Sequence, residues 1–218
     1  FTAQELYEFW DRALAAFRHA VNRQGEYRVR CDIAGVPIDL VYAGASLREA
    51  FRPALHGIET ADIGVPKGQI LVFDSASSGI PWPDFDKPIR HLIQRRGECW
   101  AQSDAKQQIT YQISESTLQI YDPELCICIV IINDLRELPP WVFAAPLRTP
   151  LAMLLQTHGV QFVHGAAVGT EAGAVLITGY GGSGKSTTAL SCYRAGLSVL
   201  GDDYVAITQI SIESPTPW

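Results

Sequence analysis

The sequence predicts an α/β protein in which a strand–loop–helix–strand core is preceded by a smaller α+β domain with antiparallel strands. Two observations predict this. The apolar segment 174–178 runs directly into a glycine-rich loop at 179–186, which a helical segment and a short apolar strand follow. Before this region, helical and alternating patterns succeed one another between turn residues. We place the boundary near residue 138, which gives domains 1–138 and 139–218.

The first domain is predicted to begin with a long helix and a hairpin. Residues 2–5 (TAQE) match a capping box, and apolar residues then recur at helical spacing up to Gly25. Alternating residues predict paired strands at 27–33 and 36–42, and Ser46 is predicted to cap a short helix. The remaining predictions are the end of that helix at Leu55, a strand at 69–73 in the loop-rich stretch 56–90, and an antiparallel meander of strands 109–113, 118–121 and 125–132.

The second domain is predicted to begin with a broken helix over 141–157, interrupted near Pro146 and Pro150. A run of strands and one helix follows it. These are strands 162–168 and 174–178, the glycine loop, a helix over 185–195, and strands 198–200 and 204–210.

The composition argues against several classes of partner. Of 218 residues, 47% are hydrophobic and 18% are charged, and the net charge is −6. An acidic chain of this kind does not favour non-specific binding to nucleic acid or to an anionic membrane. The longest apolar runs, such as 126–132, have strand length and fall far short of the roughly 20 residues of a membrane helix. We expect a cytoplasmic protein without a signal peptide.

Five cysteines occur without C-x-x-C spacing, at positions Cys31, Cys99, Cys126, Cys128 and Cys192. Cys126 and Cys128 lie two residues apart in an apolar segment, so a strand would place both on one face. A metal-binding pair is one reading, and buried, reduced thiols are the reading we expect. Because the chain begins at Phe1 rather than Met and ends soon after Asp203, we expect it to be part of a longer protein.

The glycine loop GYGGSGKS matches the pattern G-x-x-x-x-G-K-[ST] at every fixed position. Backbone N–H groups and the helix dipole at such a loop favour phosphate, Lys185 can reach the β and γ phosphates, and the Ser186 hydroxyl can bind magnesium. A chance glycine turn is the alternative. The residues predicted to bind the nucleotide are Gly179, Tyr180, Gly181, Gly182, Ser183, Gly184, Lys185, Ser186 and Thr187.

Two carboxylates, Asp202 and Asp203, follow the short apolar strand 198–200. In a parallel sheet this position lies beside the glycine loop. One carboxylate could hold magnesium while the other accepts a proton from an attacking hydroxyl. The alternative is a Gly-Asp-Asp turn at the surface. His164, in the strand 162–168, is either a packed strand residue or a group that faces the phosphates or the aspartates.

Residues 163–207, VHGAAVGTEAGAVLITGYGGSGKSTTALSCYRAGLSVLGDDYVAI, resemble the core of the HPr kinase/phosphorylase family. The family shares its P-loop and Asp-Asp arrangement with phosphoenolpyruvate carboxykinases. The resemblance implies an HPr-kinase-like core, incomplete at its C-terminus in this chain, with ATP and magnesium as cofactors. It implies that His164 lies near the phosphates and acts in catalysis with Lys185, that Asp202 is the general base, and that Asp203 binds the metal together with Ser186.

Residues 1–138 do not resemble the N-terminal domain of those enzymes, so HPr is not the expected acceptor. Related kinases act on ribosomally made peptides, and lasso-peptide kinases phosphorylate a C-terminal serine of the precursor. The resemblance therefore implies an ATP-dependent kinase for a serine of a peptide or small protein. The hairpin and meander of the first domain offer strand edges that could pair with an extended peptide, so we expect this domain to recognise the substrate. The alternatives are a nucleotide-sensing regulatory or partner-binding protein without turnover, and a small-molecule or carboxykinase-like enzyme. The sequence leaves the acceptor and any homo-oligomer open.

Overall fold

The computed structural model describes residues 3–61, 64–83, 98–102 and 107–208. The chain divides into two compact units, Phe1–Thr157 and His158–Trp218, and each is described by itself. Within these described residues, every helix is either too short or too polar to cross a bilayer. The α/β class is confirmed, because helices flank a mixed sheet of parallel and antiparallel strands.

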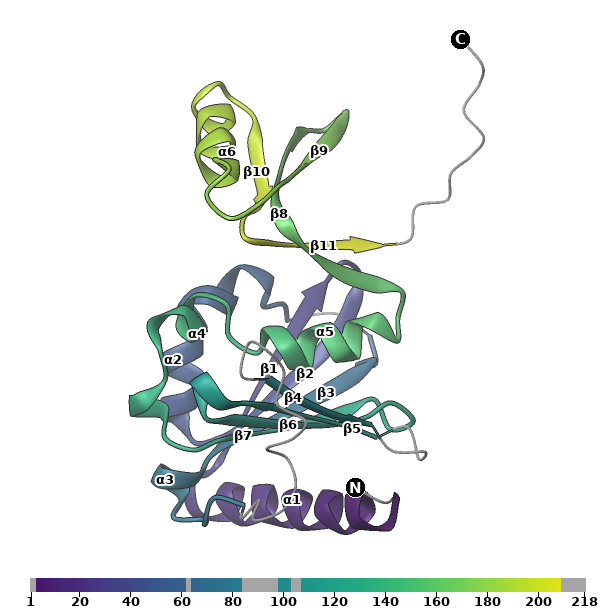
Figure 1. The fold of residues 1–218 in the computed structure, drawn as a ribbon, viewed down its shortest axis with the longest axis vertical. Coiled ribbons are helices and arrows are strands. Elements are labelled where there is room, and N and C mark those ends of the chain that lie inside the picture. Colours follow the sequence, from purple (N-terminus) through teal and green to yellow (C-terminus); the bar gives the residue numbers. More distant parts are fainter. Residues whose placement is uncertain (1–2, 62–63, 84–97, 103–106, 209–218) are drawn as a thin grey trace. The chain divides into compact units, whose positions relative to one another are not determined.

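The first unit contains a seven-stranded sheet in the order β1-β2-β3-β7-β6-β5-β4 (Figure 1). Strands β2, β3 and β7 are parallel to one another, and all other neighbours are antiparallel. The strands are β1 (Glu26–Ile33), β2 (Val36–Ala43), β3 (Gly68–Asp74), β4 (Glu98–Gln102), β5 (Gln108–Gln112), β6 (Thr117–Asp122) and β7 (Ile127–Ile132).

The parallel pairs correct the prediction of an α+β domain with antiparallel strands. The predicted hairpin and meander are confirmed as β1–β2 and β5–β6–β7. However, β2 pairs with β3 through a helical crossover, and β3 then pairs with β7. These three strands are buried on both faces, which explains why β7 reads ICIVII without alternation.

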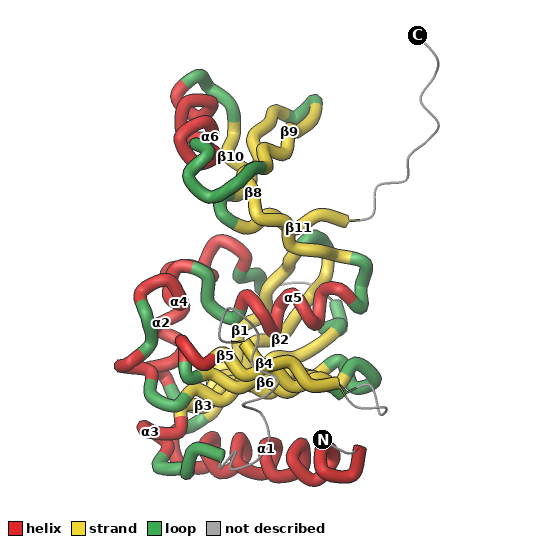
Figure 2. The backbone as a smooth tube through the Cα atoms, in the orientation of Figure 1, coloured by secondary structure: helices red, strands yellow, loops and turns green. Residues whose placement is uncertain are grey.

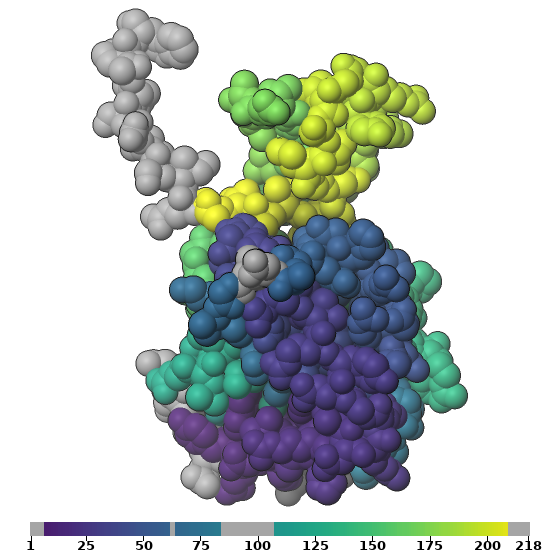
Figure 3. All heavy atoms as spheres, turned by 180° about the vertical axis from the view of Figure 1, so that it is seen from behind, coloured from purple at the N-terminus to yellow at the C-terminus, as the bar shows by residue number. Residues whose placement is uncertain are grey.

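Helices cover both faces of this sheet (Figure 2). Helix α1 (Ala3–Gln24) packs one face with Phe9, Trp10 and Phe17 against alternate residues of the central strands. On the other face lie α2 (Ala45–Leu55), α4 (Pro140–Ala144) and α5 (Arg148–Gln156). Seen from behind, the surface of the first unit is formed mainly by residues from the early part of the sequence, drawn purple to blue (Figure 3).

Short elements complete the first unit. Helix α3 (Ser75–Ser78) follows β3, and single turns occupy His56–Ile58, Ile113–Glu115 and Leu135–Glu137. Neither α3 nor β4 is predicted from the sequence. The N-cap of α2 is Gly44 rather than Ser46, and the Thr2 of the predicted capping box lies outside the described residues. The predicted helix break occurs at Pro146, whereas Pro150 lies in the first turn of α5, where proline is tolerated.

The division between the units lies beyond the boundary expected near residue 138. Helix α5 buries Leu151, Leu154 and Leu155 and packs against strands of the first sheet. Residues 140–156 therefore belong to the core of the first unit. The first unit is also the larger of the two, not the smaller.

The cysteine pair does not form the same-face arrangement that the sequence predicts. Cys126 precedes β7 in a turn, with φ of 52°, and its Sγ donates to the Pro123 carbonyl. Cys128 is buried within β7, where burial raises the pKa of its thiol. Burial likewise raises the pKa of the Cys31 thiol to about 12. Cys31, Cys126, Cys128 and Cys192 are free thiols.

A buried carboxylate joins β2 to the edge strand β1. Asp39 is only 2% exposed. Its Oδ2 accepts from Arg28 Nη1 at 3.0 Å and from Arg30 Nη2 at 3.3 Å, and its Oδ1 accepts from Arg30 Nε. Burial tends to raise the pKa of Asp39, but the two guanidinium groups outweigh it and hold the pKa below its usual range. This cluster fixes the hairpin register on one face.

The second unit is built around one long strand. Strand β8 (Val160–Thr170) pairs with β9 (Gly173–Thr178) along one edge, and with β10 (Ser198–Gly201) and β11 (Tyr204–Thr208) in nearly continuous register along the other. Helix α6 (Lys185–Arg194) packs Ala189 against Ala166 and Val168 of β8. The predicted strand 204–210 is confirmed as far as residue 208, and the rest of it lies outside the described residues.

Candidate functional site

The glycine loop and the two aspartates lie at the same end of the second sheet. Both β9 and β10 run antiparallel to β8, which lies between them. The expectation of a parallel sheet joining them is therefore wrong, but the two strands still run in the same direction, one on each side of β8. Their carboxyl ends come out opposite Gly165 and Ala167, so the residues that follow them converge.

The loop 179–186 ends in the first turn of α6. Gly182 and Gly184 have φ of +77° and +87°, a region that only glycine adopts without strain. Gly184 is the N-cap of α6, and its carbonyl accepts the first helical bond from Thr188 N–H at 2.8 Å. The N–H groups of the first turn have no partner four residues back, so they are the groups that an anion would meet here.

The amine of Lys185 lies over its own loop. Lys185 Nζ donates to the carbonyls of Gly179 at 3.0 Å and Tyr180 at 3.1 Å. The Tyr180 carbonyl also accepts from Ser183 N–H at 3.1 Å. Lys185 thus ties the start of the loop to the first turn of α6.

The hydroxyl of Ser186 contacts the first aspartate. Ser186 Oγ donates to Asp202 Oδ1 at 3.0 Å, which links the start of α6 to the end of β10. Both side chains are exposed. A hydroxyl and a carboxylate supply the oxygen ligands that magnesium prefers, and here they lie within hydrogen-bond distance of each other. Ser186 and Asp202 therefore fit that ion.

The second aspartate faces the predicted histidine. His164 Nε2 lies 3.3 Å from Asp203 Oδ1, and these side chains are 49% and 64% exposed. The His164 ring lies 5.6 Å from the ring of Tyr204, tilted by 31°. Asp203 has φ of +68°, and its carbonyl accepts from Gly165 N–H at 3.1 Å. The strand path is therefore turned at Asp203, so that Asp202 and Asp203 point to different neighbours.

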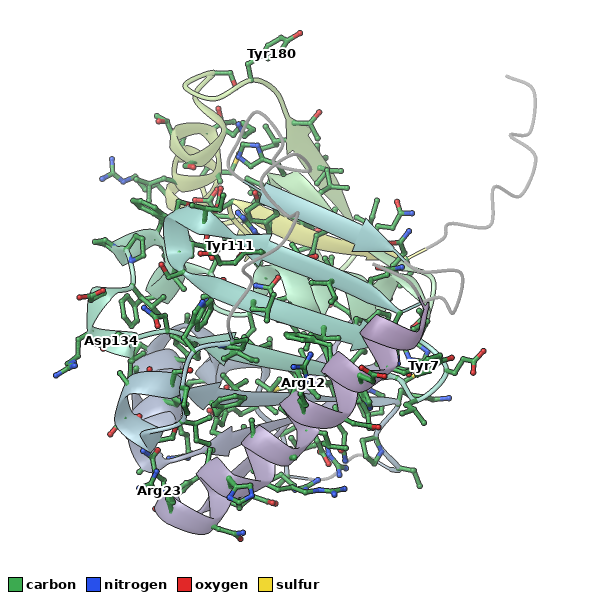
Figure 4. All side chains as sticks on the ribbon, turned by 60° about the horizontal axis from the view of Figure 1, so that its bottom comes forward. Tyr7, Arg12, Arg23, Tyr111, Asp134 and Tyr180 are labelled. Carbon is green, nitrogen blue, oxygen red and sulfur yellow. The ribbon has the colours of Figure 1, made fainter. Side chains whose placement is uncertain are left out.

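The structure brings together five predicted residues, His164, Lys185, Ser186, Asp202 and Asp203. His164 is not a packed strand residue. Tyr180, predicted to bind nucleotide, is 93% exposed and projects away from the loop (Figure 4). The Thr187 carbonyl accepts a hydrogen bond from Ser191 Oγ within α6. The nucleotide contacts expected of Thr187 and Gly181 stay predictions.

Sequence reasoning missed two contributors. Gly165 anchors the Asp203 carbonyl, and Tyr204 lies against His164. Both positions directly follow a residue singled out in the sequence, and that adjacency is the signal that could have found them. Among the described residues, His, Cys, Asp and Glu side chains nowhere gather in threes to bind a metal. Magnesium in nucleotide sites does not need such a group, because it takes one or two protein oxygens together with phosphate.

Comparison with known proteins adds no assignment. No family model matches the chain, and no curated protein matches it.

Proposed function

We propose that this chain carries the nucleotide-binding part of an ATP-dependent kinase that phosphorylates a serine hydroxyl of a peptide or small protein. The proposal rests on one observation above all: Ser186, at the end of the loop that follows β9, donates to Asp202, which follows β10 on the opposite side of β8. Lys185 and Asp203 are the sequence neighbours of these two residues. A chance glycine turn would give no reason for a cation, a hydroxyl and two carboxylates to gather at one end of a sheet.

The loop supplies the phosphate contacts in this proposal. The backbone N–H groups at the start of α6 would cradle the phosphates of ATP, and the dipole of α6 adds positive potential there. Lys185 would exchange its two carbonyl contacts for the β and γ phosphates, which are stronger acceptors because they are charged. As part of this proposal, the core of the second unit is HPr-kinase-like.

Magnesium would be held by Ser186 and Asp202. Their oxygens are already neighbours at 3.0 Å, and nucleotide-binding loops of this type commonly pair the loop hydroxyl with an aspartate. When bound, the ion neutralises charge on the transferred phosphoryl group. The resemblance assigns the metal to Asp203 instead. The observed contact favours Asp202.

The base in this proposal is Asp203, supported by His164. The serine oxygen attacks the γ phosphorus, its proton passes to the Asp203 carboxylate, and the bond from the γ phosphorus to the bridging oxygen breaks to release ADP. His164 lies 3.3 Å from that carboxylate and would hold it in position. The two aspartates thus exchange the roles that the resemblance implies.

Incubating the whole chain with magnesium, γ-labelled ATP and a serine-containing peptide library tests the proposal. We expect phosphoserine by mass mapping, and loss of at least a hundredfold in rate in Lys185→Ala, which keeps the fold but removes the loop cation. ATP binding without transfer would favour a nucleotide sensor. Transfer to small hydroxyl compounds but not to peptides would favour a small-molecule kinase. Absence of ATP binding would contradict all three.

A further inference from the structure

The free edge of β9 is the edge that faces away from β8, and the strand leads directly into the glycine loop. Among the described residues, β9 pairs only with β8 (Figure 1). Its sequence, GAVLIT, has no charge and no proline, and Val175 and Leu176 are 64% and 40% exposed. Strand edges in native proteins are normally blocked by charge, proline, a bulge or a covering segment.

The edge strand β1 of the first sheet carries such protection, and the opposite edge of the second sheet is interrupted. Strand β1 bears the charged Arg28 and Arg30, and Cys31 forms a bridge with Glu59 while Thr60 N–H donates to the Arg30 carbonyl. On the far side of β8, the path from β10 to β11 is broken at two carboxylates and carries a register shift. Among the described residues, β9 has no charge, no proline, no bulge and no second pairing partner.

The backbone groups at the free edge can be assigned. Gly165 N–H points to Asp203, away from β9, so Gly165 and Thr178 form a pair without mutual hydrogen bonds. The carbonyls of Ile177 and Gly173 lie against Gly165 and Gly169, as the alternation requires. The N–H and C=O groups that face outward are therefore those of Ala174, Leu176 and Thr178.

We propose that this edge binds an extended peptide as an added strand, and that in the kinase proposed above this peptide is the acceptor. A row of alternating donors and acceptors is complementary to another extended backbone, and the exposed apolar side chains favour an uncharged segment. Thr178 leads straight into the glycine loop. A strand along β9 would therefore reach the phosphate end of the site, and this part of the inference rests on the proposed function.

The test separates the backbone edge from the side chains. Leu176→Pro removes one outward N–H while keeping the groups that bond to β8, and Leu176→Thr changes the side chain but keeps the N–H. The probes are eight-residue peptides of alternating valine and threonine with blocked termini. Each peptide carries serine at one end and fluorescein at the other, and serine is placed at the N-terminal end in one peptide and at the C-terminal end in the second. We expect about tenfold weaker binding by anisotropy in Leu176→Pro, and a change of less than about threefold in Leu176→Thr.

A second measurement covers the case in which Leu176→Pro fails to fold. The same peptides, N-methylated at every residue, should bind the unaltered chain at least tenfold more weakly, because they lack the N–H donors along both of their edges. Equal affinity of the methylated and unmethylated peptides would overturn the proposal. The proposal would also be overturned if the chain forms a dimer that Leu176→Pro dissociates while the peptide affinity stays the same. In that case the edge would bind a second copy of the chain.

The nucleotide site provides the control that separates the two proposals. Lys185→Ala should lose ATP binding and keep peptide binding, and Leu176→Pro should do the reverse. Peptide binding at the edge without phosphoryl transfer would leave the docking site standing and contradict the kinase.

Discussion

Asp202 and Asp203 are adjacent in sequence, yet their carboxylates have different partners. Asp202 accepts from Ser186, whereas Asp203 faces His164. The positive φ of Asp203 turns the chain between them. The residue pattern does not show which carboxylate contacts which partner, because that division is a property of the backbone at this turn.

Conservative variants distinguish the two carboxylates. We expect Asp202→Asn to raise the magnesium concentration for half-maximal rate about tenfold or more, because one ion ligand is weakened. We expect Asp203→Asn to lower turnover by roughly 10² to 10⁴ at saturating magnesium, the usual effect of losing a general base. Magnesium titrations of both variants measure this. The opposite pattern would return the roles to those of the resemblance, and unchanged turnover in both would contradict the kinase.

The buried Asp39 predicts a pH dependence of stability. Its pKa is lower in the folded state than in the unfolded chain, so its contribution is complete above the unfolded value of about 3.9 and is lost as the pH falls through the folded value. Asp39→Asn should reduce the free energy of unfolding by about 1–3 kcal/mol at pH 7, because two guanidinium groups lose their charged partner.

Urea unfolding between pH 7 and pH 3 measures that difference. The gap between the original chain and Asp39→Asn should narrow toward pH 3. Asp11→Asn, on the exposed side of α1, is the control and should show no gap. A constant gap at all pH values would show that the amide disturbs packing rather than charge.

At the level of elements, most of the helices and strands could be predicted because their signals are local. The apolar spacing of α1, the alternation of β1, and the proline at 146 each act within about ten residues. Pairing of β2, β3 and β7 could not be predicted, because it joins segments separated by long connections. The prediction that Cys126 lies in the strand is wrong for a related reason, because an apolar run does not mark the residue at which a turn becomes a strand.

The candidate site divides in the same way. The motif identifies Lys185 and Ser186, and the Gly-Asp-Asp sequence identifies the acids. Their contacts depend on β8 lying between β9 and β10, which no local pattern encodes. The exposed edge of β9 was equally hidden, because an apolar segment before a glycine loop predicts a buried strand.

Two glycines of the loop provide a matched test of backbone conformation. Gly184 has φ of +87° and Gly181 has no such requirement, and a Cβ at either position would meet nothing within 4 Å. Without nucleotide, Gly184→Ala should lower the free energy of unfolding by about 1 kcal/mol through strain alone. Gly181→Ala should be neutral or slightly stabilising. Equal effects in denaturant titrations would contradict the assigned role of Gly184 as a left-handed cap.

For the whole molecule, the two compact units predict a local response to nucleotide. Magnesium-ATP at about 100 times its dissociation constant should stabilise what it binds by about 2.7 kcal/mol. Hydrogen exchange followed by mass spectrometry should show this protection in residues 158–208 and not in the first unit. Lys185→Ala should lose the protection. Protection spread equally over both units would contradict the assignment of the site to the second.

The left-handed backbone at Asp203 has a consequence for how the protein would evolve. Glycine would adopt this conformation with roughly 1 kcal/mol less strain, so aspartate at position 203 lowers the stability of the fold. A lineage propagated in the laboratory for heat resistance alone should drift to glycine or asparagine at position 203. A second lineage selected for phosphoryl transfer should retain aspartate. Sequencing the codon for residue 203 in both lineages measures this difference.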